Sequence, residues 1–129
     1  MNKKRILVVD DEEQIRIMYS QALSRAGYEV KTAESAEEAL EIIAETPYMV
    51  MFLDLNLPGM NGVDLCRKIK KSLPAAIIHA VTGYASFYEI TACREAGFDD
   101  YFTKPVSMND LDDAAESAFK KLSRWNTRM

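Results

Sequence analysis

The feature that most constrains the fold is an alternation, along the whole chain, of short apolar runs with segments of helical periodicity. The apolar runs predict strands at Arg5–Val9, Tyr28–Thr32, Met49–Leu53, Ala76–Val81 and Tyr101–Thr103. The periodic segments predict helices over Glu12–Ala26, after a cap at Ser35, and over Val63–Lys71, Ser86–Ala96 and Met108–Arg124. This alternation predicts an α/β fold, in which helices cover both faces of a parallel sheet.

The character of the runs also predicts the order of the strands. Three of them are apolar on both faces and therefore belong in the centre of the sheet: Ile6–Val9, Met49–Leu53 and Ala76–Val81. The alternating run Tyr28–Thr32 and the short run Tyr101–Thr103 suit the edges. With right-handed crossovers, the sequence predicts a five-stranded parallel sheet of order 2-1-3-4-5, the flavodoxin-like doubly wound arrangement.

Length and composition limit the class of protein. The 129 residues, 48% of them hydrophobic, suffice for one domain spanning 1–129, with a core from about residue 5 to residue 122. The net charge of −4 gives no reason to expect nucleic-acid binding. No apolar run approaches the ~20 residues of a membrane span, and no secretory signal is recognisable. We therefore expect a cytoplasmic protein without a membrane partner, with Cys66 and Cys93 as reduced, packed thiols.

Polar residues follow four of the expected strands at the point where each strand ends. Asp10 and Asp11 follow the first strand, and Asp54 follows the third. Thr82 follows the fourth strand, and Lys104 follows the fifth. Because ligands of such sheets bind beyond the carboxyl ends of the strands at the switch point, we expect these side chains to form one site.

Carboxylates gathered at one rim repel each other, by about 4 kcal/mol for a pair ~4 Å apart at an effective dielectric near 20. Raised pKa values or a divalent cation would relieve the repulsion. The rim offers only oxygen ligands, which favours Mg²⁺. Asp54 is then a carboxylate nucleophile that can accept a phosphoryl group as an acyl phosphate. Lys104 and Thr82 are suited to hold the phosphoryl oxygens.

The motifs "VVDD", "FLDLNLPGMNG", "AVTGY" and "YFTKP" resemble those of the receiver domain of two-component response regulators, from about Arg5 to Leu122. The resemblance implies that Asp54 takes its phosphoryl group from a phosphohistidine on a partner histidine kinase or histidine phosphotransferase. It also implies that Asp11 binds Mg²⁺ directly and that Asp10 binds it largely through water. Asn56 would contribute its backbone carbonyl.

The same resemblance implies a switch and two partner surfaces. Thr82 and Tyr101 would be the switch pair, the hydroxyl moving toward the phosphoryl group and the ring turning inward. The Lys104–Pro105 peptide bond would be cis. The phosphodonor would contact a surface comprising Gln14, Ile15, Met18, Tyr84 and Pro105. Ile15 and Met18 also lie on the apolar stripe of their expected helix, so packing alone remains an open explanation for both.

Relatives use the opposite surface for output. In this sequence that surface would contain Phe87, Tyr88, Tyr101 and the last helix. It would bind a downstream protein target, which the sequence does not identify, or a second copy in a phosphorylation-dependent homodimer. Only Ser123–Met129 follow Leu122, so both a stand-alone receiver and a piece of a longer regulator remain open.

Two single residues carry separate hypotheses. Tyr84 and Asn56 occupy positions that in this family shade or orient the attacking water, and the bulk of Tyr84 is expected to slow loss of the phosphoryl group. His79 lies inside an expected strand. We expect it to be packed or hydrogen-bonded in the sheet rather than phosphorylated.

Two other classes share part of the pattern. A haloacid-dehalogenase-type phosphatase also uses a strand-end aspartate, but it usually has a second acid two residues later, where this chain has Asn56. A flavodoxin-like electron carrier would need a Ser/Thr/Gly-rich loop after the first strand, where this chain has "DDEEQI". The receiver interpretation is therefore preferred.

Overall fold

The computed structural model describes residues 4–83 and 86–128, without the side chains at 87, 88 and 126–128. Its strands are β1 (Arg5–Val9), β2 (Glu29–Ala33), β3 (Val50–Asp54), β4 (Ile77–Thr82) and β5 (Asp100–Thr103). Its helices are α1 (Glu13–Arg25), α2 (Ala36–Glu45), α3 (Gly62–Ser72), α4 (Phe87–Ala96) and α5 (Met108–Arg128). Every predicted element is present, and α5 continues past the predicted end at Arg124.

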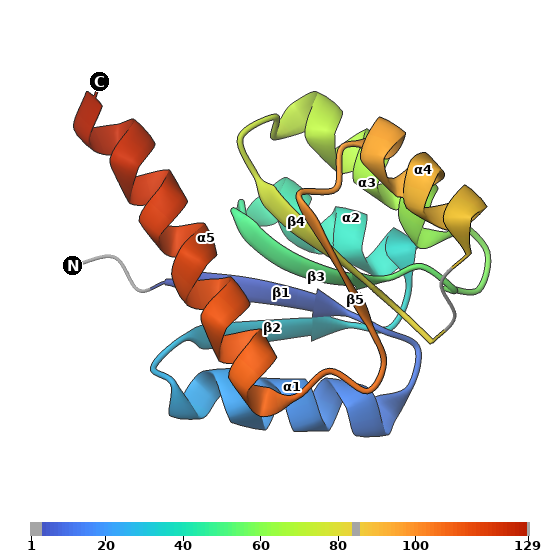
Figure 1. Ribbon diagram of the computed structural model, residues 1–129, viewed down its shortest axis with the longest axis horizontal. Coiled ribbons are helices and arrows are strands. Elements are labelled where there is room, and N and C mark those ends of the chain that lie inside the picture. Colours follow the sequence, from blue (N-terminus) through green and yellow to red (C-terminus); the bar gives the residue numbers. More distant parts are fainter. Residues whose placement is uncertain (1–3, 84–85, 129) are drawn as a thin grey trace.

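The sheet has the order β2-β1-β3-β4-β5, and each neighbouring pair is parallel, as predicted. All residues of β3 and β4 are buried, whereas β2 and β5 at the edges are partly exposed. In Figure 1, α1 and α5 cover one face of the sheet, and α2, α3 and α4 cover the other. The fold-class prediction is confirmed.

Strand β1 shows how the sequence fills both core layers. Successive side chains of a strand point to opposite faces. Ile6 and Val8 accordingly join the layer under α1 and α5, while Leu7 and Val9 join the layer under α2 and α3. All four are at most 1% exposed, which explains why this run is continuously apolar.

Helix α1 packs on the sheet through Tyr19, Ala22 and Leu23, and Ile15 packs partly against the same layer. The prediction that Met18 lies on this stripe was wrong, since Met18 is 49% exposed. With 3.6 residues per turn, Met18 is rotated by ~100° from Tyr19 and leaves the buried face. Ile17 is 50% exposed.

The predicted cap at Ser35 is confirmed, and two further helix ends have local signals of the same kind. The Ser35 hydroxyl accepts a hydrogen bond from the Glu38 backbone N–H at 3.1 Å. The Ser107 hydroxyl accepts one from Asp110 at 3.0 Å. Gly97 ends α4 with a left-handed φ of 104°, a conformation that favours glycine.

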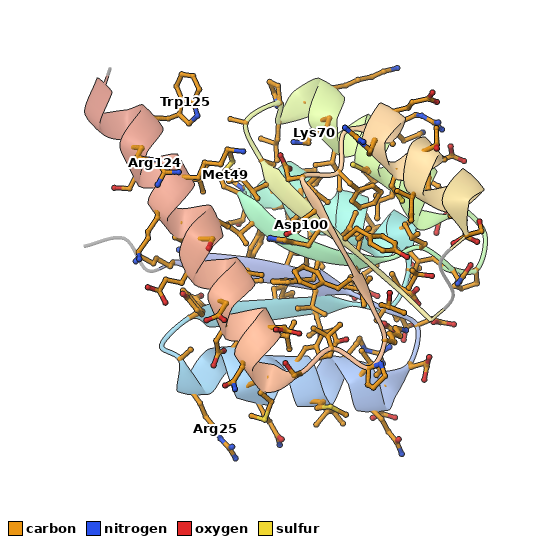
Figure 2. The ribbon with its side chains drawn as sticks, in the orientation of Figure 1. Arg25, Met49, Lys70, Asp100, Arg124 and Trp125 are labelled. Atoms are coloured by element: carbon orange, nitrogen blue, oxygen red, sulfur yellow. The ribbon has the colours of Figure 1, made fainter. Side chains whose placement is uncertain are left out.

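Helix α5 is longer than the sheet beneath it. It has 21 residues, which corresponds to about 31 Å. Its last turns therefore extend past the amino ends of the strands (Figure 1). Figure 2 shows Arg124 and Trp125 on this extension, and Trp125 is 61% exposed.

His79 is a buried polar residue in the middle of β4, as predicted. It is 3% exposed, and its Nδ1 lies 2.9 Å from the Met51 carbonyl oxygen. Its ring stacks on Phe52, with 4.4 Å between the centroids. Burial lowers the pKa of His79, so the ring is neutral at pH 7.

Two further expectations concern the thiols and the membrane. Cys66 and Cys93 are buried and free, as predicted. Within residues 4–83 and 86–128, no helix combines the length and apolar character needed to cross a membrane.

Candidate functional site

The carboxyl ends of four strands bring the predicted polar residues to one rim. Asp54 and Thr82 are the last residues of β3 and β4, Asp10 directly follows β1, and Lys104 directly follows β5. The Lys104 ammonium lies 3.0 Å from Asp10 Oδ2 and 3.4 Å from Asp54 Oδ2. The parallel sheet thus joins groups that are fifty residues apart in sequence.

These groups are buried as well as close. Asp10 is 2% exposed, Asp54 is 4% exposed, and Thr82 is fully buried. Burial raises the pKa of Asp54, and the charge of Asp10 adds to this effect. The Asn56 backbone N–H and Lys104 act in the opposite direction. Asp54 is therefore a carboxylate whose negative charge is only partly compensated.

Lys104 is the counterion of this pocket. Burial disfavours the charged form of Lys104. The hydrogen bond and charge of Asp10, with the charges of Asp54 and Glu12, favour that form and outweigh burial. The pKa of Lys104 is consequently raised, so the ammonium stays charged at all physiological pH values. Sequence reasoning assigned Lys104 to phosphoryl oxygens and did not foresee its pairing with Asp10.

Two residues that sequence reasoning missed hold Asp10 in place: Glu12 in the loop between β1 and α1, and Arg16 on α1. The Glu12 backbone N–H donates to Asp10 Oδ1 at 2.9 Å. Arg16 Nη1 donates to the Asp10 carbonyl oxygen at 2.9 Å, and Arg16 Nη2 lies 3.8 Å from Glu34. The run of acids after Asp11 was the available signal for Glu12, whereas nothing in the sequence distinguishes Arg16 from a solvated helix residue.

The same loop offers a set of oxygen ligands. One carboxylate oxygen each from Asp10, Asp11 and Glu12 lies within 4.8 Å of the others. The Lys104 ammonium approaches this cluster, at 3.5 Å from Glu12 Oε1. An all-oxygen set beside a buried, incompletely compensated carboxylate suits a hard divalent cation such as Mg²⁺. The residues present therefore fit that ion.

The loop after β3 holds Asp54 from the other side. The Asn56 backbone N–H donates to Asp54 Oδ1 at 3.1 Å, and Asn56 itself is exposed. The Gly62 N–H donates to the Leu55 carbonyl at 3.1 Å. A Cβ atom at Gly62 would lie 2.2 Å from the Asp54 carbonyl oxygen. Sequence reasoning missed this close approach.

Thr82 and Tyr101 occupy the same face of neighbouring strands. Thr82 pairs with Thr103, and Ala80 pairs with Tyr101. Because side chains alternate along a strand, residues two apart share a face. The Tyr101 ring packs against a small cluster containing Ala80 and Cys93, and its buried hydroxyl has no hydrogen-bond partner among the described residues.

The Lys104–Pro105 peptide bond is cis, as the resemblance implied. The Lys104 backbone N–H donates to the Thr82 carbonyl at 2.7 Å. This contact places Lys104 beside the end of β4.

The predicted phosphodonor surface is only partly described. Gln14, Met18 and Pro105 are exposed, and Ile15 is half-buried. Tyr84 lies outside the described residues. The side chains of Phe87 and Tyr88, predicted on the output surface, are outside them too.

Comparisons with known proteins agree with this geometry. Residues 6–116 match the family described as the response regulator receiver domain. A CheY-like receiver domain from Methanospirillum hungatei is 35% identical, with a TM-score of 0.86 over 93% of this chain and 99% of that one. A receiver domain from Clostridium thermocellum is 32% identical, with a TM-score of 0.88 over 94% of this chain and 98% of that one.

Longer proteins also match. The transcriptional regulatory protein ResD of Bacillus subtilis is 36% identical over 110 residues, which are 85% of this chain and 45% of ResD. A cyclic di-GMP phosphodiesterase of Thermotoga maritima is 35% identical over 106 residues, 82% of this chain and 28% of that protein. The chain spans about half, or less, of the length of these relatives.

The chain belongs to the receiver-domain family of two-component response regulators. Members of this family accept a phosphoryl group on an aspartate and are generally not conventional enzymes. Family membership gives no support to the phosphatase or the electron carrier considered above.

Proposed function

We propose that this receiver accepts a phosphoryl group on Asp54, from a phosphohistidine of a histidine kinase or histidine phosphotransferase, in a Mg²⁺-dependent reaction. The observation that carries the proposal is the convergence of Asp54, Asp10 and Lys104, with the ammonium 3.4 Å and 3.0 Å from the two carboxylates. A buried strand-end carboxylate beside a fixed cation is suited to nucleophilic phosphoryl transfer.

In the proposed step an Asp54 carboxylate oxygen forms a bond to phosphorus, and the phosphorus–nitrogen bond of the donor breaks. The donor imidazole keeps the electron pair of that bond and takes up a proton. The product is an acyl phosphate on Asp54. Lys104 exchanges a carboxylate contact for the incoming phosphoryl oxygens, and the Thr82 hydroxyl binds another of them.

Mg²⁺, when bound, neutralises charge that develops on the phosphoryl oxygens. Asp11 and Asp54 would hold it directly, Asp10 largely through water, and Asn56 through its carbonyl oxygen. Glu12 lies close enough to Asp10 and Asp11 to join this set.

The proposed consequence is a change on the face formed by α4, β5 and α5. A phosphoryl group adds about −1.5 to −2 charges and three strong acceptors. Movement of Thr82 toward it would bias the Tyr101 ring and thereby binding of a protein target or of a second copy. A cytoplasmic location, the absence of nucleic-acid contacts by this chain and the slowing of hydrolysis by Tyr84 remain predictions.

The test is phosphotransfer from a panel of purified, autophosphorylated histidine kinases to the full chain. We expect transfer from a cognate kinase with Mg²⁺ and none after chelation by EDTA. Asp54→Asn should accept no label. Labelling of Asp54→Asn at the wild-type rate, or wild-type transfer that is indifferent to EDTA, would contradict the proposal.

A further inference from the structure

Tyr19 is a buried residue that the proposed chemistry does not yet use. It is 2% exposed, and its hydroxyl oxygen is buried without a hydrogen-bond partner among residues 4–83 and 86–128. Its ring packs in the layer that includes Val81 and Val106, close in sequence to Thr82 and Lys104. An unpaired buried hydroxyl costs about 1–3 kcal/mol, and a phenylalanine would fill the same space without that cost.

Tyr19 lies in the core layer that adjoins the acidic pocket, since Val81 and Val106 of the same layer flank Thr82 and Lys104 in sequence. Helix α1 begins at the rim, and long side chains on a helix lean toward its N-terminus. Burial is the main reason that the pKa of Tyr19 is raised to about 12, and the charges that act on it belong to Lys104, Asp10, Asp54 and Glu12. All four groups belong to the site, so the Tyr19 side chain lies within reach of their charges.

The Lys104 ammonium would need another hydrogen-bond acceptor if a cation bound at the pocket. An ammonium has three N–H donors, and here they face three carboxylates: Asp10 at 3.0 Å, Asp54 at 3.4 Å and Glu12 at 3.5 Å. If those carboxylates turn to a divalent cation, Lys104 loses acceptors in a largely buried place, where its side chain is 15% exposed. A donor left unpaired there would oppose binding of the cation.

We propose that Tyr19 is a positioning residue whose hydroxyl oxygen accepts a hydrogen bond from the Lys104 ammonium when Asp10 is taken by Mg²⁺. The inference rests on the proposed function, since it assumes Mg²⁺ binding at the pocket. Tyr19 does not contact the reacting atoms. It keeps Lys104 over the acceptor carboxylate once the pairing with Asp10 is lost.

The test compares Tyr19→Phe with wild type in the binding of Mg²⁺, measured by isothermal titration calorimetry. We expect the dissociation constant to rise by about ten- to a hundredfold, as for loss of a hydrogen bond to a charged group. In a Lys104→Ala background, or in Lys104→Met if that variant folds better, Tyr19→Phe should change the constant less than twofold. Tyr48→Phe is the matched control, because Tyr48 is also buried but lies in the opposite core layer.

A second readout separates positioning from packing. Without Mg²⁺, Tyr19→Phe should melt at the wild-type temperature or above, because it removes an unpaired hydroxyl. The increase in Tm on adding Mg²⁺ should be smaller than in wild type.

Unchanged Mg²⁺ affinity in Tyr19→Phe, or an equal loss with and without Lys104, overturns the inference. If one of these results is obtained while the wild type still accepts the phosphoryl group from a kinase, only the inference about Tyr19 fails. If the wild type neither binds Mg²⁺ nor is phosphorylated, the proposed function fails and the inference falls with it.

Discussion

The interior of the sheet and its carboxyl rim each bury an ionisable side chain, with opposite results. His79 in the interior bonds to the Met51 carbonyl, and burial lowers its pKa, so the ring is neutral and satisfied. Asp54 at the rim is buried to a similar extent, but a second carboxylate and an ammonium surround it. Both side chains are buried. They differ in charge, because the negative charge of Asp54 at the rim is compensated only in part, and a reactive group requires such a charge.

The largest loss of stability is expected from a substitution that disturbs the backbone at the rim. Gly62→Ala would place a Cβ atom 2.2 Å from the Asp54 carbonyl oxygen, so the loop must shift. We expect a loss of about 2 kcal/mol in the free energy of unfolding by urea, and slower phosphorylation. Gly83→Ala is the matched control, since a Cβ there meets nothing within 4 Å. Equal stability of the two variants would contradict the close approach.

A substitution in the interior should affect stability without affecting phosphorylation. His79→Phe keeps a ring on Phe52 but loses the bond to Met51, at a cost of about 1 kcal/mol at pH 7.5. Because the pKa of His79 is lowered in the folded state, the unfolded chain takes up the proton first as pH falls below ~6.5. As the pH falls, the free energy of unfolding of the wild type therefore decreases, whereas His79→Phe has no such loss.

The stability difference between wild type and His79→Phe should consequently narrow between pH 7.5 and pH 5, as measured by urea unfolding at each pH. A constant difference would show that His79 has the same pKa in both states. A lower phosphorylation rate in His79→Phe would contradict the expectation that substitutions in the interior leave phosphorylation unaffected.

Asp54→Asn should stabilise the fold while abolishing phosphorylation. Burial raises the pKa of Asp54, so ionisation of this group destabilises the folded state above the ordinary carboxyl pKa. At pH 7 the neutral amide should raise Tm by about 4 °C, the shift that roughly 1 kcal/mol produces in a domain of this size. Below pH ~3.9 the wild-type carboxyl is protonated in both states, and the gain should vanish. Calorimetric melting at both pH values checks this, and a variant less stable at pH 7 would contradict it.

The smallest effect on stability is expected at Met18. Since Met18 is 49% exposed, Met18→Ala should change the free energy of unfolding by less than about 0.5 kcal/mol. If Met18 belongs to the phosphodonor surface, transfer from the kinase should slow severalfold, while phosphorylation by acetyl phosphate stays unchanged. Ile90→Ala is the control, because Ile90 is also an exposed apolar residue but lies on α4. Equal kinase rates for the two variants would remove Met18 from that surface.

The sequence was sufficient for the sheet and for the residues at its rim. The apolar runs of β3 and β4 correspond to strands that are buried on both faces, so their central position could be predicted. Asp54 could be placed because it closes such a run. Ser35 marked the start of α2 through local chemistry that does not depend on the rest of the fold.

What could not be predicted depends on distances between separate elements. The pairing of Lys104 with Asp10, the clamp of Arg16 on the Asp10 carbonyl and the approach of Gly62 to Asp54 are contacts across loops. Met18 was misplaced because periodicity does not fix the rotation of a helix to within one residue. The extension of α5 was missed because no stop signal follows Arg124.

The length of α5 has a practical consequence for spectroscopy. Trp125 is the one tryptophan of the chain and lies 17 residues beyond Met108, or about 25 Å along the helix axis. Its indole is solvent-exposed at the end of the helix remote from the rim. Intrinsic fluorescence should therefore be silent to cation binding and phosphorylation at Asp54, and an optical reporter must be introduced beside the pocket.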